Sequence, residues 1–267
     1  MMVNNEVNSA KIQVKHKVSS ILDNAIFIKS KSYKKIYELF NTLKTSRGKI
    51  IHIIGAPGTG KSTNIYFALY DLDLKYYEPK FILKDENASP LIVFNKVIHE
   101  LKKDLGVKSS DELFQKLSQY DAILFADKFH DTHLNNDKMV GFSRWTDSKG
   151  FRSFYFYWLC IKEYFSQREK FKNINIVFQT AWRIYIRGEK YDLFSDLGVI
   201  SLIFKKMLNL FFDVVTIAYT DEEIIKIVKA HYPTLDEREI TKYIKKYGLK
   251  PRYILSHIEK DYNLKNG

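Results

Sequence analysis

The sequence is poor in cysteine and has no long apolar run. Its single cysteine, Cys160, excludes a disulfide bond within the chain. Because Cys160 directly follows the aromatic run 154–159, we expect a buried thiol rather than a nucleophile. No apolar stretch approaches the roughly 20 residues that cross a bilayer, and residues 1–17 are polar, without the apolar centre of a signal peptide. These absences predict an intracellular, cytoplasmic protein that does not insert into a membrane.

Positive charge is in excess. The 267 residues include 43 lysines and arginines against 31 aspartates and glutamates, a formal net charge of +12. A polyanionic partner such as DNA suits this charge, because Lys and Arg release counterions when they neutralise phosphates. The lysines are scattered, however, and a thermophilic or AT-rich source gives a similar composition. Charge alone therefore leaves DNA contact and a solvated basic surface equally open.

A glycine-rich segment follows the apolar run 49–54. It has the spacing G-x-x-x-x-G-K-[ST] and reads Gly55, Ala56, Pro57, Gly58, Thr59, Gly60, Lys61, Ser62, Thr63. Glycines at this spacing let successive backbone N–H groups point at a β-phosphate, and the N-terminus of the next helix adds its dipole. Lys61 would bridge the β- and γ-phosphates, and the Ser62 hydroxyl would ligate Mg²⁺. The segment predicts a site for ATP and Mg²⁺; the alternative is a chance glycine-rich turn.

Strands and helices alternate along most of the chain. Apolar runs predict five strands, at 49–54, 76–83, 121–127, 173–180 and 212–218. Helical periodicity predicts helices at 32–45, 64–71, 90–105, 109–117, 151–168, 202–210, 221–231, 236–247 and 251–262. This order predicts the α/β class, with a parallel five-stranded sheet, helices on both faces, and a small all-α lid at the end. The expected domains are an N-terminal arm (1–31), a nucleotide-binding core (32–219) and the lid (220–267).

Asp127 ends the third predicted strand. Ligands bind at the carboxyl ends of the strands of a parallel sheet, which is where the glycine-rich segment also begins. We therefore expect Asp127 to anchor Mg²⁺ together with Ser62, because hard oxygen ligands suit this ion. The alternative is an ordinary aspartate in a turn after a strand.

This order of motifs resembles the AAA+ ATPases. In the resemblance, residues 55–63 are the Walker A segment and residues 123–127 are Walker B. The similarity extends over residues 30–262 and is nearest in layout to archaeal or mobile-element initiator and loader ATPases. It implies a P-loop NTPase core followed by a helical lid.

The resemblance also implies roles for two later segments. Residues 174–180 take the place of the sensor-1 strand, where Gln179 or Thr180 would position the attacking water. Residues 248–255 resemble sensor 2, in which Arg252 would project over the γ-phosphate. An arginine near a helix start is otherwise commonly a solvated surface residue.

One position departs from the family pattern. Walker B normally continues with a glutamate that polarises the attacking water, whereas this chain has Lys128. Asp131 is the preferred replacement base, and Glu86 after the second strand is the other candidate. If neither acts as a base, either a neighbouring subunit supplies the base or hydrolysis is slow and the chain is an ATP-dependent switch.

Other polar residues have weaker functional readings. Arg183 and Arg187 are candidates for an arginine finger, although Lys205 and Lys206 stand closer to the usual helical position, and each is equally well a surface cation. The segment 128–150 and the helix start after it mix basic residues with aromatic ones, Trp145 among them, which suggests stacking on a single nucleic-acid strand or else an ordinary lid. No metal other than Mg²⁺ is expected, because the histidines of this segment lack a further ligand at metal-binding spacing.

The implied function is that of a homo-oligomeric ATPase. The resemblance suggests a ring or filament that hydrolyses ATP and acts on DNA or a DNA-bound protein, in replication, loading or mobile-element maintenance. The alternatives are the switch with little hydrolysis and, less favoured, a P-loop kinase of small molecules. The late Walker B segment and the all-helical end argue against the kinase.

Overall fold

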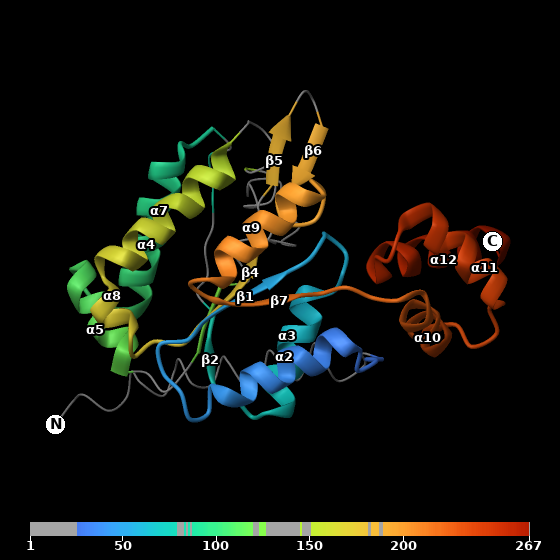
Figure 1. Cartoon of the computed structure of the whole chain (residues 1–267), viewed down its shortest axis with the longest axis horizontal. Coiled ribbons are helices and arrows are strands. Elements are labelled where there is room, and N and C mark those ends of the chain that lie inside the picture. The colour runs from blue at the N-terminus through green and yellow to red at the C-terminus, as the bar shows by residue number, and fades with distance from the viewer. Residues whose placement is uncertain are drawn as a thin grey trace. The chain divides into compact units, whose positions relative to one another are not determined.

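The computed structural model describes residues 26–78, 83, 85, 87–119, 123–126, 145, 151–180, 183–186 and 189–266 (Figure 1). Most of the predicted N-terminal arm (1–31) lies outside these residues. So does most of the segment 128–150.

Five strands form a parallel sheet. They are β1 (Ile50–Ile54), β2 (Tyr76–Tyr77), β3 (Ile123–Ala126), β4 (Ile176–Thr180) and β7 (Asp213–Thr216), in the order β2-β3-β4-β1-β7. In the register, Tyr76 lies opposite Ile123, and Leu124 lies opposite Ile176. All five residues of β1 are buried, and its apolar sequence, interrupted only by His52, is typical of a strand inside an α/β sheet. The predicted class and the five parallel strands are confirmed.

Ten helices are described, and most lie where the periodicity predicts them. They are α2 (Lys31–Thr42), α3 (Lys61–Asp71), α4 (Pro90–Leu105), α5 (Ser110–Gln119), α7 (Arg152–Ser166), α8 (Arg168–Phe171), α9 (Val199–Asn209), α10 (Asp221–His231), α11 (Glu237–Tyr247) and α12 (Pro251–Asn266). Local signals set their ends. In α4 the Ser89 hydroxyl accepts the Ile92 N–H at 3.3 Å, Pro90 occupies the first turn, and Gly106 ends the helix in the left-handed conformation.

Two segments differ from the predicted elements. The second strand, expected over 76–83, is described as a strand only at Tyr76–Tyr77, with an isolated bridge at Leu83. An antiparallel hairpin, β5 (Arg183–Ile186) and β6 (Glu189–Asp192), was not predicted. Its strands are four residues long, which is too short for a clear alternation of apolar and polar residues. The Arg-Gly pair between them is the sequence signal for a turn at this hairpin.

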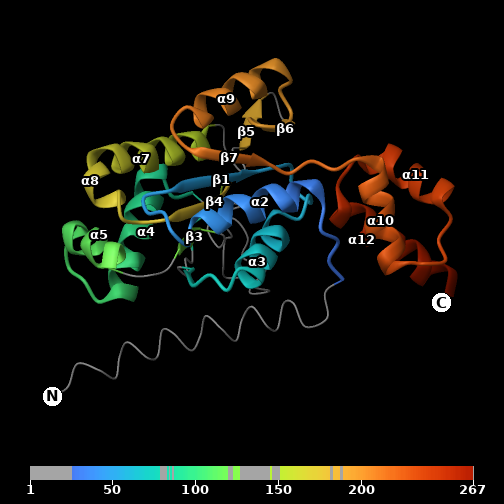
Figure 2. The same cartoon turned by 60° about the horizontal axis from the view of Figure 1, so that its bottom comes forward.

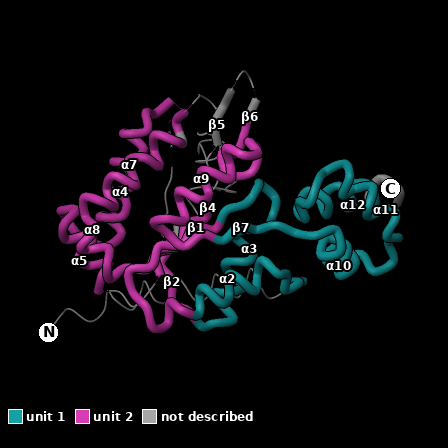
Figure 3. Tube along the Cα trace, in the orientation of Figure 1, with its two compact units in different colours: residues 1–41, 54–73, 215–267 teal, residues 42–53, 74–214 magenta. Residues whose placement is uncertain are grey.

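The chain divides into two compact units (Figure 3). Unit 1 consists of Met1–Asn41, Ile54–Asp73 and Val215–Gly267, and unit 2 of Thr42–Ile53 and Leu74–Val214. The sequence-based domain limits at 31 and 219 stay predictions.

Within unit 1, α2 is hydrogen-bonded to the segment that precedes α10 and to α10 itself. The Ser32 hydroxyl donates to the Ala218 carbonyl at 2.7 Å and accepts the Ala218 N–H at 3.1 Å. Glu223 accepts the Thr220 N–H at 3.1 Å, completing a capping box on α10, and accepts the Lys31 N–H at 2.8 Å with its other carboxylate oxygen. One carboxylate therefore satisfies free N–H groups at the starts of two helices.

Unit 2 is built around aromatic contacts between helices. The inward residues of α4 recur every four positions, at Val93, Val97, Leu101 and Leu105, and all four are buried. Phe94 of α4 meets Phe156 of α7 edge to face, with 6.5 Å between ring centroids. Cys160 on α7 is partly buried, and desolvation raises the pKa of its thiol to about 12. This thiol is protonated at neutral pH and is a poor nucleophile.

Candidate functional site

Residues 55–62, called the glycine loop from here on, connect β1 to α3. Gly58 has φ 86° and Gly60 has φ 75°, a region of backbone conformation that residues with a Cβ rarely adopt. A Cβ on Gly58 would also lie 3.0 Å from the ring of Tyr253. The backbone conformation of the loop thus requires glycine at two positions, Gly60 of the motif and Gly58 between its fixed positions.

Short polar contacts fix the glycine loop. The N–H and the hydroxyl of Thr59 both donate to the Ala56 carbonyl, at 3.3 and 2.8 Å. Asn64, on the first turn of α3, donates its own N–H and its Nδ2 to the Gly60 carbonyl, at 3.0 and 2.8 Å. The loop is therefore held in one conformation by side chains of its own sequence.

Lys61 brings a positive charge into the glycine loop. It is the first residue of α3 and only 6% exposed, and its Nζ donates to the carbonyls of Gly55 at 2.7 Å and Ala56 at 3.2 Å. The N-terminus of α3 adds the positive end of the helix dipole at the same place. Ser62 is half-buried and Thr63 is exposed. The loop thus combines an ammonium group, a helix N-terminus and backbone without Cβ atoms, which is a suitable setting for an anion.

Tyr219, which follows β7, is hydrogen-bonded to the backbone of the glycine loop and to Asn64. Its hydroxyl donates to the Thr59 carbonyl at 2.9 Å and accepts Asn64 Nδ2 at 3.2 Å. Burial raises the pKa of the Tyr219 phenol, so the group stays a neutral donor. Sequence reasoning missed this residue. A single tyrosine after a strand carries no pattern that points to a loop 160 positions away in the chain.

The amino end of α12 also contacts the glycine loop. The Arg252 N–H donates to the Gly58 carbonyl at 3.1 Å, which satisfies one of the free N–H groups of the first helical turn. The Tyr253 ring packs on Gly58, and Lys250 Nζ lies 5.9 Å from the centroid of that ring. The predicted site residue Arg252 therefore lies at the loop through its backbone, while its side chain is exposed.

The end of β4, in unit 2, holds a second group of predicted residues. Gln179 and Thr180 are both buried, and Thr180 Oγ1 is hydrogen-bonded at 2.9 Å to Nδ1 of His52 on β1. Burial lowers the pKa of His52 to about 3, so its ring is neutral at ordinary pH. The strand order places β4 between β3 and β1. Two polar side chains, those of Gln179 and Thr180, thus lie at the end of β4, the central strand of the sheet. His52 itself was not predicted, because a histidine inside an apolar strand gives no sign of its partner.

Several predicted residues lie outside the described part of the chain. They are Glu86, Asp127, Lys128, Asp131 and Arg187. Arg183 begins β5. Among the residues that the structure describes, no group of three or more His, Cys, Asp or Glu side chains could hold a metal ion. The predicted Ser62 and Asp127 pair stays a prediction.

Trp145 is not available for stacking on a nucleic-acid strand, and this expectation is wrong. The side chain is fully buried, and its indole N–H donates to the Ala88 carbonyl at 2.7 Å. Its ring meets Phe156 edge to face at 6.1 Å, and the Arg152 guanidinium lies 5.8 Å from the ring centroid. A tryptophan among polar residues in the sequence can itself pack in the core, as Trp145 does.

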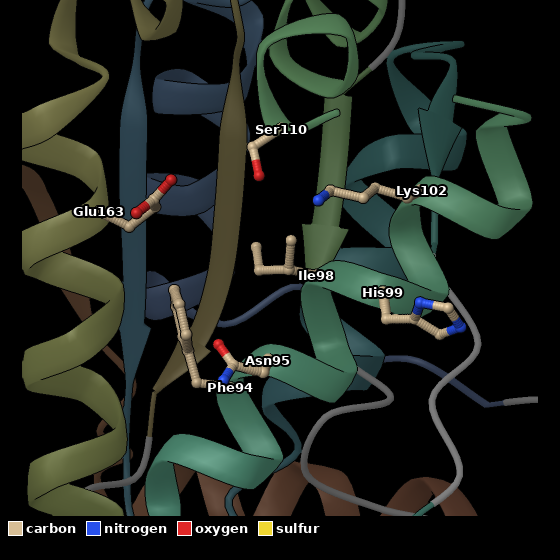
Figure 4. A pocket seen from close by; sticks show the side chains of 7 residues that line it. All are labelled: Phe94, Asn95, Ile98, His99, Lys102, Ser110 and Glu163. Carbon is tan, nitrogen blue, oxygen red and sulfur yellow. The ribbon is translucent and has the colours of Figure 1, made fainter. Parts of the chain in front are cut away.

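Unit 2 also contains a shallow pocket of about 390 Å³ between α4, α5 and α7. Figure 4 shows Lys102 and Ser110 on one side of it and Glu163 of α7 across from them, above an apolar floor that includes Phe94 and Ile98. None of its lining residues was predicted as a site residue.

No described helix combines the length and the apolar character needed to cross a membrane. Comparison with models of known protein families gave no match, and comparison with curated proteins also gave none.

Proposed function

We propose that the chain binds ATP at the glycine loop and hydrolyses it, as an ATPase of the AAA+ type. The observation that carries the proposal is the conformation of the loop: two left-handed glycines, a buried lysine at the helix start, and backbone held open between β1 and α3. Backbone N–H groups of the loop would surround the β-phosphate, and Lys61 would move from the loop carbonyls onto the phosphate oxygens.

The Mg²⁺ ion would be held by the Ser62 hydroxyl and the Asp127 carboxylate, both of them hard oxygen donors that suit it. When bound, the ion neutralises negative charge on the phosphate oxygens. Gln179 or Thr180 would orient the attacking water, and Asp131 or Glu86 would take its proton.

The exposed Arg252 side chain would contact the γ-phosphate from the start of α12. Support for this role comes from the backbone bond between Arg252 and Gly58, which keeps the arginine beside the loop. The helices α10 to α12 would then act as the lid of the nucleotide site, with residues 220–267 as one domain.

The substrate proposed for this ATPase is DNA or a DNA-bound protein, in replication, loading or mobile-element maintenance, and the working form is a homo-oligomer. The net charge of +12 supports a polyanionic partner. Lys128, where the family has glutamate, favours a second candidate function: a switch that binds ATP tightly and hydrolyses it slowly.

Calorimetric titration with ATP and Mg²⁺ tests the nucleotide site. We expect Lys61→Ala to weaken ATP binding by about a hundredfold or more, because a charge-assisted phosphate contact is lost, while the fold persists. Lys35→Ala, which removes an exposed lysine of α2, is the matched control and should bind as the native chain does. Equal affinity in the native chain and Lys61→Ala would remove the proposed site. Turnover measured with and without single- and double-stranded DNA then separates a DNA-stimulated ATPase from the switch.

A further inference from the structure

The outer face of α9 is apolar. Ser201 and Leu208, seven residues apart, are buried and therefore mark the inward face of the helix. On the opposite side, Val199, Ile203 and Leu210 are 72%, 52% and 79% exposed. A surface helix of a globular protein usually turns its apolar stripe toward the core. The pattern of α9 is reversed, as in a helix whose outer face is covered by a partner.

A second apolar stripe runs along α7. Phe151, Tyr155, Trp158 and Phe165 follow the spacing i, i+4, i+7, i+14, which places them on one side of the helix. Each is about half exposed or more. Phe156 and Tyr157 of the same helix are buried on its other side. The helix therefore has an aromatic face toward the core and another toward solvent.

The two stripes meet. The Phe165 ring lies perpendicular to the ring of Phe211, just after α9, with 6.0 Å between centroids, and Tyr164 contacts Phe212 at 5.4 Å. Figure 2 shows α7 and α9 over the same side of β1 and β4, all of them in unit 2. We call the combined area the α7–α9 surface. Its exposed residues are Phe151, Phe154, Tyr155, Trp158, Phe165, Val199, Ile200, Leu202, Ile203, Met207, Leu210 and Phe211.

The exposed apolar area of the α7–α9 surface is larger than the largest apolar patch of a typical monomer. Of the 18 large apolar side chains that are exposed in the described part of the chain, 12 belong to the α7–α9 surface, so the exposure is concentrated and not scattered. Twelve large side chains at about half exposure leave roughly 1,000 Å² open. The largest apolar patch of a typical monomer is about 300–600 Å². A stable protein interface buries about 800 Å² on each partner.

We propose that the α7–α9 surface is the interface between two copies of this chain, related by a twofold axis so that each copy contributes the same face. Its exposed large side chains are aromatic or aliphatic, which suits a homodimer interface, and the exposed Lys162 of α7 and Lys206 of α9 lie on the same sides of these helices. Apolar contact also suits two copies that repel each other by charge, since each carries a net charge of +12.

A twofold arrangement follows from where the other exposed apolar residues lie. A head-to-tail contact needs a second, complementary apolar surface on the same chain. The six remaining exposed large apolar residues in the described part are dispersed, at Ile26, Tyr37, Tyr70, Leu91, Ile92 and Tyr253. They do not form a matching surface, whereas the α7–α9 surface can cover itself.

Sedimentation of the full chain without nucleotide, over a wide range of concentrations, tests the proposal. We expect a monomer–dimer equilibrium, and we expect Ile203→Glu and Trp158→Glu each to weaken it about tenfold or more, because a charge is buried at the interface. Both positions are exposed in the single chain, so folding, checked by circular dichroism, should be unchanged. Ile92→Glu is the matched control: Ile92 is 58% exposed on α4, outside the surface, and its variant should dimerise normally. Lys61→Ala should also dimerise normally, which separates this test from that of ATP binding.

Three outcomes would overturn the proposal. The first is a monomer at every concentration. The second is the formation of mixed dimers between the native chain and Ile203→Glu with the same affinity as the native dimer. In a head-to-tail dimer the substituted chain could still bind through its other, unchanged face, whereas in a twofold dimer both chains use the same face. The third is a monomer that floats with vesicles of phosphatidylcholine and phosphatidylserine and stops floating in Ile203→Glu, because the surface would then bind lipid. Weak mixed dimers, with the native dimer intact, are the result that a twofold interface requires.

Discussion

The glycine loop and the end of β4 are both polar, yet they are built in opposite ways. The loop is held mainly by bonds between near neighbours in the sequence, such as Thr59 to Ala56 and Lys61 to Gly55, and Tyr219 and Arg252 are its two distant partners. The end of β4 is held by a bond between residues 128 positions apart, His52 and Thr180, inside the core. The loop can therefore be changed with little effect on the rest of the fold, whereas changes at the β4 end affect stability as well as chemistry.

The largest effect is expected in turnover, where the proposed base acts. If Asp131 or Glu86 takes the proton of the attacking water, replacing the active one by alanine should lower ATP turnover by about two to four orders of magnitude. If the chain is a switch, native turnover should already be near the uncatalysed rate, and Lys128→Glu should raise it. Single-turnover kinetics with each variant separates the two cases. Native turnover that survives both alanine variants would leave neither residue as the base.

The next-largest effect is expected on stability and ATP affinity when the backbone conformation of the glycine loop is changed. Gly58→Ala should cost about 1–2 kcal/mol in stability, because φ 86° is strained for a residue with a Cβ, and should also weaken ATP binding by displacing Tyr253. Gly106→Ala is the matched control: Gly106 has φ 64°, and a Cβ there would meet no atom within 4 Å. It should lose similar stability, measured by urea unfolding, and keep its ATP affinity. A Gly58→Ala chain with unchanged ATP affinity would show that the loop conformation is not part of the site.

At the end of β4, stability should depend on pH. His52 has its pKa lowered by burial to about 3, against about 6.5 in an unfolded chain, so the unfolded chain binds the proton more readily. The free energy of unfolding should therefore fall as pH drops below about 6.5, by about 1.4 kcal/mol per pH unit, until pH nears 3. Urea titrations at several pH values measure the slope. His52→Phe should lack this contribution, whereas His231→Gln, at an exposed site on α10, should keep it. The same slope in His52→Phe as in the native chain would contradict the assignment.

The smallest effect is expected at Tyr219. Tyr219→Phe removes a hydroxyl bonded to Thr59 and Asn64, and should lower the free energy of unfolding by about 1 kcal/mol. ATP affinity should fall only a few-fold, since the loop keeps its own short-range bonds. Tyr37→Phe, on the exposed side of α2, serves as control and should change neither quantity. A loss of ATP binding in Tyr219→Phe as large as in Lys61→Ala would show that the loop is not held by its own sequence.

The contrast between short-range and long-range contacts also explains which features could be predicted from the sequence. The glycine loop, the five strands and most helices depend on short-range patterns, and these lie close to where the patterns place them. The hairpin at 183–192 was missed because its strands are four residues long. Tyr219, Tyr253 and His52 were missed because their partners lie far away in the chain, and no periodicity encodes such a contact. Trp145 was misread for a related reason: its burial depends on Ala88 and Phe156, not on its neighbours in the sequence.

Glu223 is a hydrogen-bond acceptor for both the start of α10 and the start of α2. Its two carboxylate oxygens accept one N–H from each, the Thr220 N–H at the start of α10 and the Lys31 N–H at the start of α2. Because Glu223 belongs to α10, a change in the orientation of α10 relative to α2 would leave the Lys31 N–H without this acceptor. Replacing Glu223 by alanine should therefore weaken the starts of two helices at once, although Lys31 and Glu223 are 192 positions apart in the chain.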